Sequence, residues 1–157
     1  MNSILRFVQV FALGAWVGSI IYLSFVVAPG AFGVLQSRDQ AGLMVGYSLA
    51  RLHFIGMVAA VLYLVAGLAL AQSVKAFLQP AMLGVILMLL LTTVSQTRVT
   101  PRMTELRTEM VSVDATPKDN PLRVEFDRQH RVSVRIEVVV LMLGIVALFL
   151  TVRNAGK

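Results

Sequence analysis

The sequence contains no cysteine and only two histidines among its 157 residues. The lack of cysteine excludes disulfide bonds, thiolate nucleophiles and zinc or iron–sulfur sites built on cysteine. Charged residues are also scarce, at 14% of the chain, whereas 57% of the residues are hydrophobic. Soluble domains contain about 45–50% apolar residues. This chain therefore requires a less polar surrounding than water.

Four long segments with little charge predict four membrane-spanning helices. Residues 7–37, 52–74 and 76–97 carry no Lys, Arg, Asp or Glu, and each is longer than the roughly 20 residues that cross a bilayer. The fourth uncharged segment is shorter, so its span must include Arg135 and Glu137. The expected spans are residues 4–27, 52–72, 80–99 and 132–152, all within a single integral membrane domain that covers residues 1–157.

Prolines and capping residues indicate where these helices begin and end. The first helix should end before Pro29, because proline disfavours helical geometry in the residue before it. Ser37 has capping-box spacing to Gln40, so the second helix should begin near Arg38. Pro80 is expected in the first turn of the third helix, where proline is tolerated.

The start of the fourth helix is marked by Asn120 as N-cap and Pro121 as first residue. Pro101 should kink the third helix where it leaves the membrane. Beyond Pro101, apolar residues recur at three-and-four spacing among charged ones, which predicts an amphipathic helix outside the membrane. These residues are Met103, Leu106, Met110 and Val113, and Leu122 and Phe126 should pack against them from the fourth helix.

The predicted fold is thus all-α. It is an antiparallel four-helix transmembrane bundle with a protruding helical hairpin, at about residues 100–131, between helices 3 and 4. Small residues predict close helix contacts in lipid. Gly14 and Gly18 are four apart on the first helix, and Gly56, Ala60, Tyr63 and Gly67 share one face of the second.

Basic residues are unevenly distributed between the two ends of this bundle. Of 14 Lys and Arg, four would lie on the side of the termini and the remaining ten on the side of the hairpin. Loops rich in Lys and Arg face the cytoplasm, so the hairpin is expected there. The net charge of +6 fits anionic lipid headgroups, so membrane lipid and other membrane protein subunits are the expected partners, and nucleic acid is not.

Polar residues gather at the hairpin end of the bundle, which makes it the candidate site. On the fourth helix, His130, Ser133 and Glu137 share one face, and an ionisable residue inside a membrane is a functional-site hypothesis. A structural role is the alternative, in which Glu137 is neutral or is neutralised by Arg51, Arg98 or His53. The candidate site residues are His53, His130, Glu137, Ser133, Arg51, Arg98 and Gln96.

The two histidines, His53 and His130, also raise the hypothesis of a haem or metal site. Imidazole is a common ligand of both, and bis-histidine ligation requires such a pair on facing helices. The alternatives are a pair that is only hydrogen-bonded and a pair that handles protons or a polar ligand. No nucleophile elbow, phosphate-binding glycine loop, HExxH motif or catalytic triad pattern occurs, so we do not expect a conventional hydrolase or kinase.

Three stretches of the chain resemble the transmembrane protein 205-like family. They are Trp16 to Phe32, Ala41-Gly42 and Phe126 to Ser133. The resemblance implies a small four-helix protein of the bacterial inner membrane, but it supplies no reaction. Gln129 and Glu137 depart from the family pattern, which has Leu and Asn there. The resemblance marks Trp16, Gly18, Pro29, Phe32, Gly42, His130 and Ser133 as family-pattern positions.

The leading functional hypothesis is a non-enzymatic membrane protein with a polar binding or interaction site at one end of the bundle. The first alternative is a haem- or metal-binding redox protein that uses His53 and His130. The second is an accessory subunit of a larger membrane complex.

Overall fold

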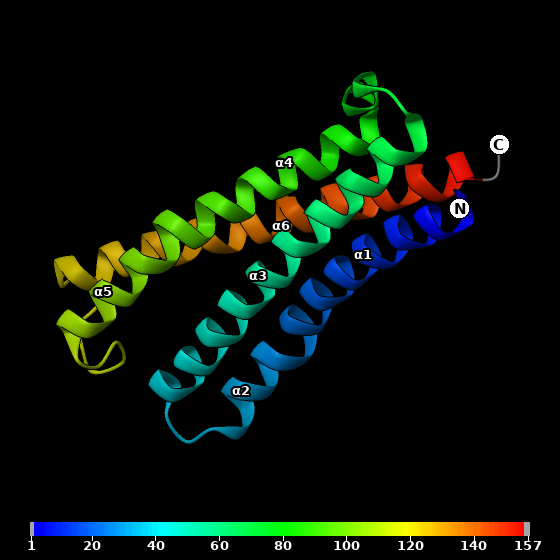
Figure 1. The fold of residues 1–157 in the computed structure, drawn as a ribbon. Helices are drawn as coiled ribbons and strands as arrows, with labels where there is room; N and C mark the ends of the chain where they lie inside the picture. The colour runs from blue at the N-terminus through cyan, green and yellow to red at the C-terminus, as the bar shows by residue number, and fades with distance from the viewer. Residues whose placement is uncertain (1, 156–157) are drawn as a thin grey trace.

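The protein is described by a computed structural model over residues 2–155. Within this range it is all helical and has no strand (Figure 1). Four helices are long and apolar enough to cross a membrane, as expected from the uncharged segments. They extend over Asn2–Val34, Arg38–Ala71, Pro80–Met110 and Pro121–Asn154.

The first long helix does not end before Pro29, so that prediction was wrong. It consists of α1 (Asn2–Tyr22), the π-helical segment η1 (Leu23–Val27) and α2 (Ala28–Val34). In η1 the N–H of Ala28 donates to the carbonyl of Leu23, five residues back. The ring of a proline clashes with the carbonyl four residues before it in a regular helix. The wider π turn accommodates Pro29, and the helix continues.

The third long helix has the same construction around Pro101. It consists of α4 (Pro80–Val94), the π-helical segment η3 (Ser95–Val99) and α5 (Thr100–Met110). As in the first helix, the π segment ends two residues before the proline. The expected start at Pro80 is confirmed.

The other two long helices begin at the predicted residues. The helix α3 (Arg38–Ala71) starts after Ser37, whose hydroxyl accepts a hydrogen bond from the N–H of Gln40. The helix α6 (Pro121–Ala155) follows Asn120, whose side-chain oxygen accepts from the N–H of Leu122. A short 3₁₀ helix, η2 (Val74–Leu78), connects α3 to α4.

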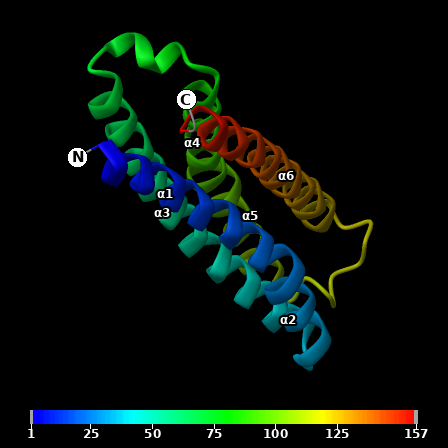
Figure 2. The ribbon, with the colours of Figure 1, turned by 90° about the vertical axis from the view of Figure 1, so that its right-hand side faces the viewer.

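The four long helices lie side by side in two pairs. In Figures 1 and 2, α1 lies along α3 and α4 lies along α6, and the start of α1 lies at the same end of the molecule as the end of α6. A Cβ added to Gly84 would meet Ala147, and one added to Gly144 would meet Met88, so residue numbers fall along α6 as they rise along α4.

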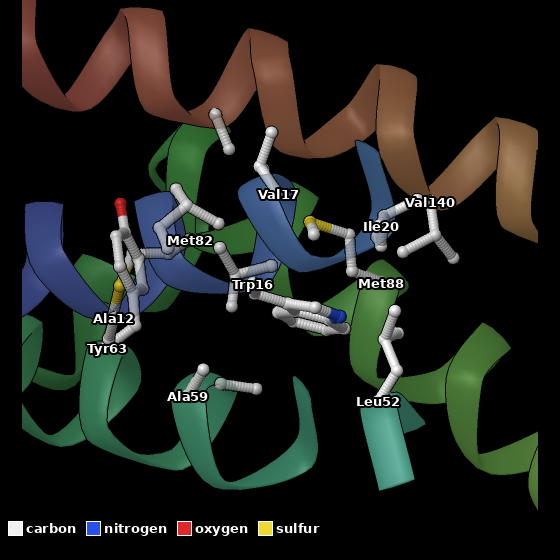
Figure 3. Close-up of a cluster of buried hydrophobic side chains, with 14 of the residues drawn as sticks. Ala12, Trp16, Val17, Ile20, Leu52, Ala59, Tyr63, Met82, Met88 and Val140 are labelled. Carbon is white, nitrogen blue, oxygen red and sulfur yellow. The ribbon is translucent and has the colours of Figure 1, made fainter. Parts of the chain in front are cut away.

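The centre of the bundle is an apolar cluster around Trp16 (Figure 3). The indole is 1% exposed and packs directly on α3, since a Cβ on Gly56 would lie 2.2 Å from its Nε1. Gly67 is similarly close to Met82. Gly14 and Gly18, in contrast, have nothing within 4 Å of an added Cβ, so the prediction of a helix contact at these two glycines was wrong.

A second apolar cluster joins α5 to the start of α6, and it contains the residues that their spacing predicted. These are Met103, Leu106, Met110, Val113, Leu122 and Phe126. Asp39 of α3 holds this part of the chain: its carboxylate accepts hydrogen bonds from the hydroxyl of Ser112 at 2.6 Å and from the N–H of Val113 at 3.0 Å. Arg107 pairs with the same carboxylate at 3.6 Å.

Candidate polar site of three helices

His53 lies at the centre of the candidate site. Its side chain on α3 is completely buried. The ring Nδ1 is 2.8 Å from Oε1 of Gln96 in η3, and the ring Nε2 is 2.6 Å from Oε1 of Glu137 on α6. One imidazole therefore joins three helical segments by hydrogen bonds.

Helical periodicity explains why Gln96 and Glu137 face this ring. On α6, Ser133 and Val140 are buried, and Glu137 lies four residues after one and three before the other, on the same face. On the third long helix, buried Thr92 lies four residues before Gln96. The buried face of each helix thus orients its polar residue towards His53.

The two contacts of the His53 ring limit where its protons can lie. With Oε1 of Gln96 turned towards the ring, Nδ1 of His53 donates a hydrogen bond to it. At 2.6 Å, a bare Nε2 lone pair facing a carboxylate oxygen would be repulsive, so a second proton lies between His53 and Glu137. With the Gln96 amide in this orientation, the pair has no net charge whether the second proton is on nitrogen or on oxygen.

Three exposed arginines surround the buried cluster on its hairpin side. Arg51, Arg98 and Arg135 each lie two residues from His53, Gln96 and Glu137 respectively, and all three are exposed. Two helical residues correspond to about 3 Å along the axis. Arginine side chains reach towards the headgroup layer at helix ends, and these three form an arginine belt at one level of the bundle.

The cluster is bordered by polar atoms with unused hydrogen-bonding capacity. Among the described residues, the buried atoms without a partner are Nε1 of Trp16, Oγ1 of Thr92 and Oγ of Ser95. Thr92 and Ser95 lie within one turn of Gln96, and Trp16 packs on Gly56, three residues after His53. Hydroxyl groups both donate and accept hydrogen bonds. Thr92 and Ser95 can therefore act as donor or as acceptor towards a proton carrier or a small polar ligand.

The structure brings some of the candidate residues together and separates others. It places Ser133 in the interior, 5% exposed, one turn from Glu137. It leaves Arg51 and Arg98 exposed, where Arg51 lies over the ring of Tyr47 with its guanidinium carbon 5.1 Å from the ring centroid. His130 is also exposed, and it is two turns, or about 10 Å along the helix, from Glu137.

This placement bears on the hypothesis of haem or metal ligation. Both ring nitrogens of His53 are engaged, so ligation together with His130 would require His53 to give up Glu137 or Gln96. Across residues 2–155, no group of three or more His, Cys, Asp or Glu side chains is arranged to hold a metal ion.

A polar cavity at the opposite end of the bundle was not expected from the sequence. It has a volume of about 230 Å³, and Gln9, Tyr63 and Thr151 contribute to its lining. The hydroxyl groups of Tyr63 and Thr151 are 2.7 Å apart, and the amide of Gln9 donates to the carbonyl of Tyr63 at 3.4 Å. Gln9 is the signal that could have indicated it, because it is a polar residue in step with buried Leu13 and Trp16.

Comparisons with known proteins identify a family without an assigned activity. No curated protein and no solved structure matches the chain. Residues 11–112 match the family described as "Domain of unknown function (DUF4149)". The matched segment contains His53 and Gln96, whereas Glu137 lies beyond it. Because this segment is more than half of the 157 residues, the chain belongs to the DUF4149 family.

Proposed function

We propose that the protein is a non-enzymatic integral membrane protein with a proton-binding site at one end of an antiparallel four-helix bundle. The site consists of His53, Gln96 and Glu137. The observation that carries the proposal is the 2.6 Å contact between the fully buried His53 ring and the Glu137 carboxyl group. Ionisable groups are expensive to place inside a membrane and mark functional sites there.

The arginine belt supports this placement in the membrane. With Arg51, Arg98 and Arg135 at one interface, the hairpin of about residues 100–131 protrudes from that face. The excess of basic residues on this side favours the cytoplasm, and the resemblance to the transmembrane protein 205-like family favours a bacterial inner membrane. The resemblance adds no chemistry, so the proposed site depends on the geometry alone.

Loss of one proton would reverse both hydrogen bonds of the cluster. After this loss Glu137 is a carboxylate and His53 is neutral, with a single ring proton. That proton must lie on Nε2 in order to donate a hydrogen bond to Glu137. Nδ1 then becomes an acceptor, and Gln96 must turn its amide so that its NH₂ group donates. An amide side chain can do this because it carries both a donor and an acceptor group.

In this second state the cluster carries one negative charge, and basic groups lie on its hairpin side. Arg51 on α3, Arg98 on η3 and Arg135 on α6 are all positive, and His130 on α6 adds a further titratable group. Within its described residues, α1 carries one charged side chain, Arg6, which lies near the opposite end. The reversal involves Gln96, which is in a π segment, a type of irregularity frequent at functional sites. Proton exchange thus changes hydrogen bonds that join three helical segments.

Nitrogen NMR of isotopically labelled histidine, in lipid nanodiscs over a range of pH, tests the proposal. His130→Gln leaves one ring to observe and assigns the signals of His53. We expect the two nitrogens of His53 to change protonation together as pH rises. Glu137→Gln should abolish this change, because a neutral amide cannot share or release the proton.

The matched control is Glu109→Gln, which removes an exposed carboxylate on α5. It should leave the His53 signals as they are in the parent protein. The proposal is overturned if the His53 ring shows the same pH dependence with and without the Glu137 carboxylate, or if Glu109→Gln changes it equally.

A further inference from the structure

A groove between α1 and α3 lies outside the polar cluster and faces away from the core. Its volume is about 610 Å³. Ala15, Gly18 and Ile55 line one end, and Tyr47 and Arg51 line the other. Trp16 packs on Gly56, and the groove follows the same two helices outwards to the level of Arg51. Along the bundle, the groove therefore extends from the level of the apolar core to the proposed membrane interface.

The apolar end of the groove has space for a hydrocarbon chain. Gly18 is exposed, and a Cβ added to it would meet nothing within 4 Å. The hydroxyl of Ser19 donates to the carbonyl of Ala15 at 2.7 Å, so its hydrogen is satisfied within α1. This end consequently presents mainly small and apolar groups.

The interfacial end presents one positive charge. Arg51 is the one Lys, Arg, Asp or Glu among the residues that line the groove, and no carboxylate within residues 2–155 forms an ion pair with it. Its guanidinium group lies over Tyr47, which holds the planar fork in place. A guanidinium fork binds phosphate oxygens in pairs.

We propose that this groove binds one anionic phospholipid of the surrounding membrane. Its phosphate contacts Arg51, and the first part of an acyl chain lies against Ala15, Gly18 and Ile55. An anionic lipid is favoured over a zwitterionic one for two reasons. The groove offers no carboxylate to a choline group, and Arg51 already covers the Tyr47 face that would attract a quaternary ammonium ion.

Native mass spectrometry of the full chain tests the proposal, with phosphatidylglycerol and phosphatidylcholine of identical acyl chains as probes. We expect one phosphatidylglycerol to be retained in preference to phosphatidylcholine. Arg51→Gln should lower the occupancy of phosphatidylglycerol about tenfold, since a charged hydrogen-bonding partner is lost. Gly18→Leu should lower the occupancy of both lipids because its side chain fills the groove.

Each variant has a matched control. Arg131→Gln removes an exposed arginine outside the groove, and Gly14→Leu adds the same side chain at a glycine with equal free space. Both should bind phosphatidylglycerol as the parent does. The proposal is overturned if the two lipids bind equally, if a control variant loses as much as its partner, or if inorganic phosphate alone displaces the bound lipid.

Discussion

Replacing Gly56 by alanine tests the packing that holds α1 against α3. The new Cβ would lie 2.2 Å from Nε1 and 2.4 Å from Cε2 of Trp16, whereas carbon atoms in contact are about 3.5–4.0 Å apart. The indole is 1% exposed, so it has little room to retreat. Either the indole or the backbone of α3 must move by about 1 Å or more.

The magnitude follows from two opposing terms. Overpacking a close-packed interior costs about 1–3 kcal/mol, and alanine gains about 1 kcal/mol over glycine inside a helix. Gly56→Ala should therefore lower the free energy of unfolding by as much as about 2 kcal/mol. Gly14→Ala should not lower it, because its Cβ meets no neighbour and only the gain in helix propensity remains.

Equilibrium unfolding in mixed detergent micelles measures both variants. A double-mutant cycle with Trp16→Leu locates the cause, since a smaller side chain leaves room for the new methyl group. The reasoning is refuted if Gly56→Ala is as stable as Gly14→Ala, or if Gly56→Ala costs the same amount with and without the indole.

Two further predictions concern polar contacts at the two ends of the molecule. Asp39→Ala removes the acceptor of Ser112 and Val113, so it should destabilise this contact by about 1–3 kcal/mol and accelerate hydrogen exchange in α5 and the turn after it. Unchanged hydrogen exchange in this segment would contradict the role of Asp39. Tyr63→Phe should cost about 0.5–1.5 kcal/mol through the lost bond to Thr151, and adding Thr151→Val to it should cost little more in the same unfolding assay; additive losses would argue against the bond.

Helix positions could be predicted from the sequence wherever a local signal decides them. Ser37 and Asn120 cap the helices that follow them, and Pro80 opens a third, because each satisfies or avoids the unpaired N–H groups of a helix start. Pro29 misled the prediction because its effect depends on the turn before it. A π turn relieves the clash between the proline ring and the carbonyl group four residues earlier. No residue type in that segment predicts such a turn.

The polar site was predictable as a region but not as a set of contacts. The positions of His53, Gln96 and Glu137 along their helices indicated one end of the bundle. The partner of Glu137 was open among Arg51, Arg98 and His53, because sequence spacing does not determine how neighbouring helices are rotated. His130 shows the same limit: it shares a face with Glu137 by spacing, yet it lies where the interior opens and is exposed.

Infrared spectroscopy of the Glu137 carboxyl group measures the shared proton from the side of the acid. Spectra of the protein in lipid nanodiscs are recorded across a pH range, and Glu137→Gln identifies the band. The account predicts that His53→Gln changes both the frequency of this band and the pH at which it disappears, while His130→Gln changes neither. A Glu137 band that titrates identically with and without His53 would contradict the account.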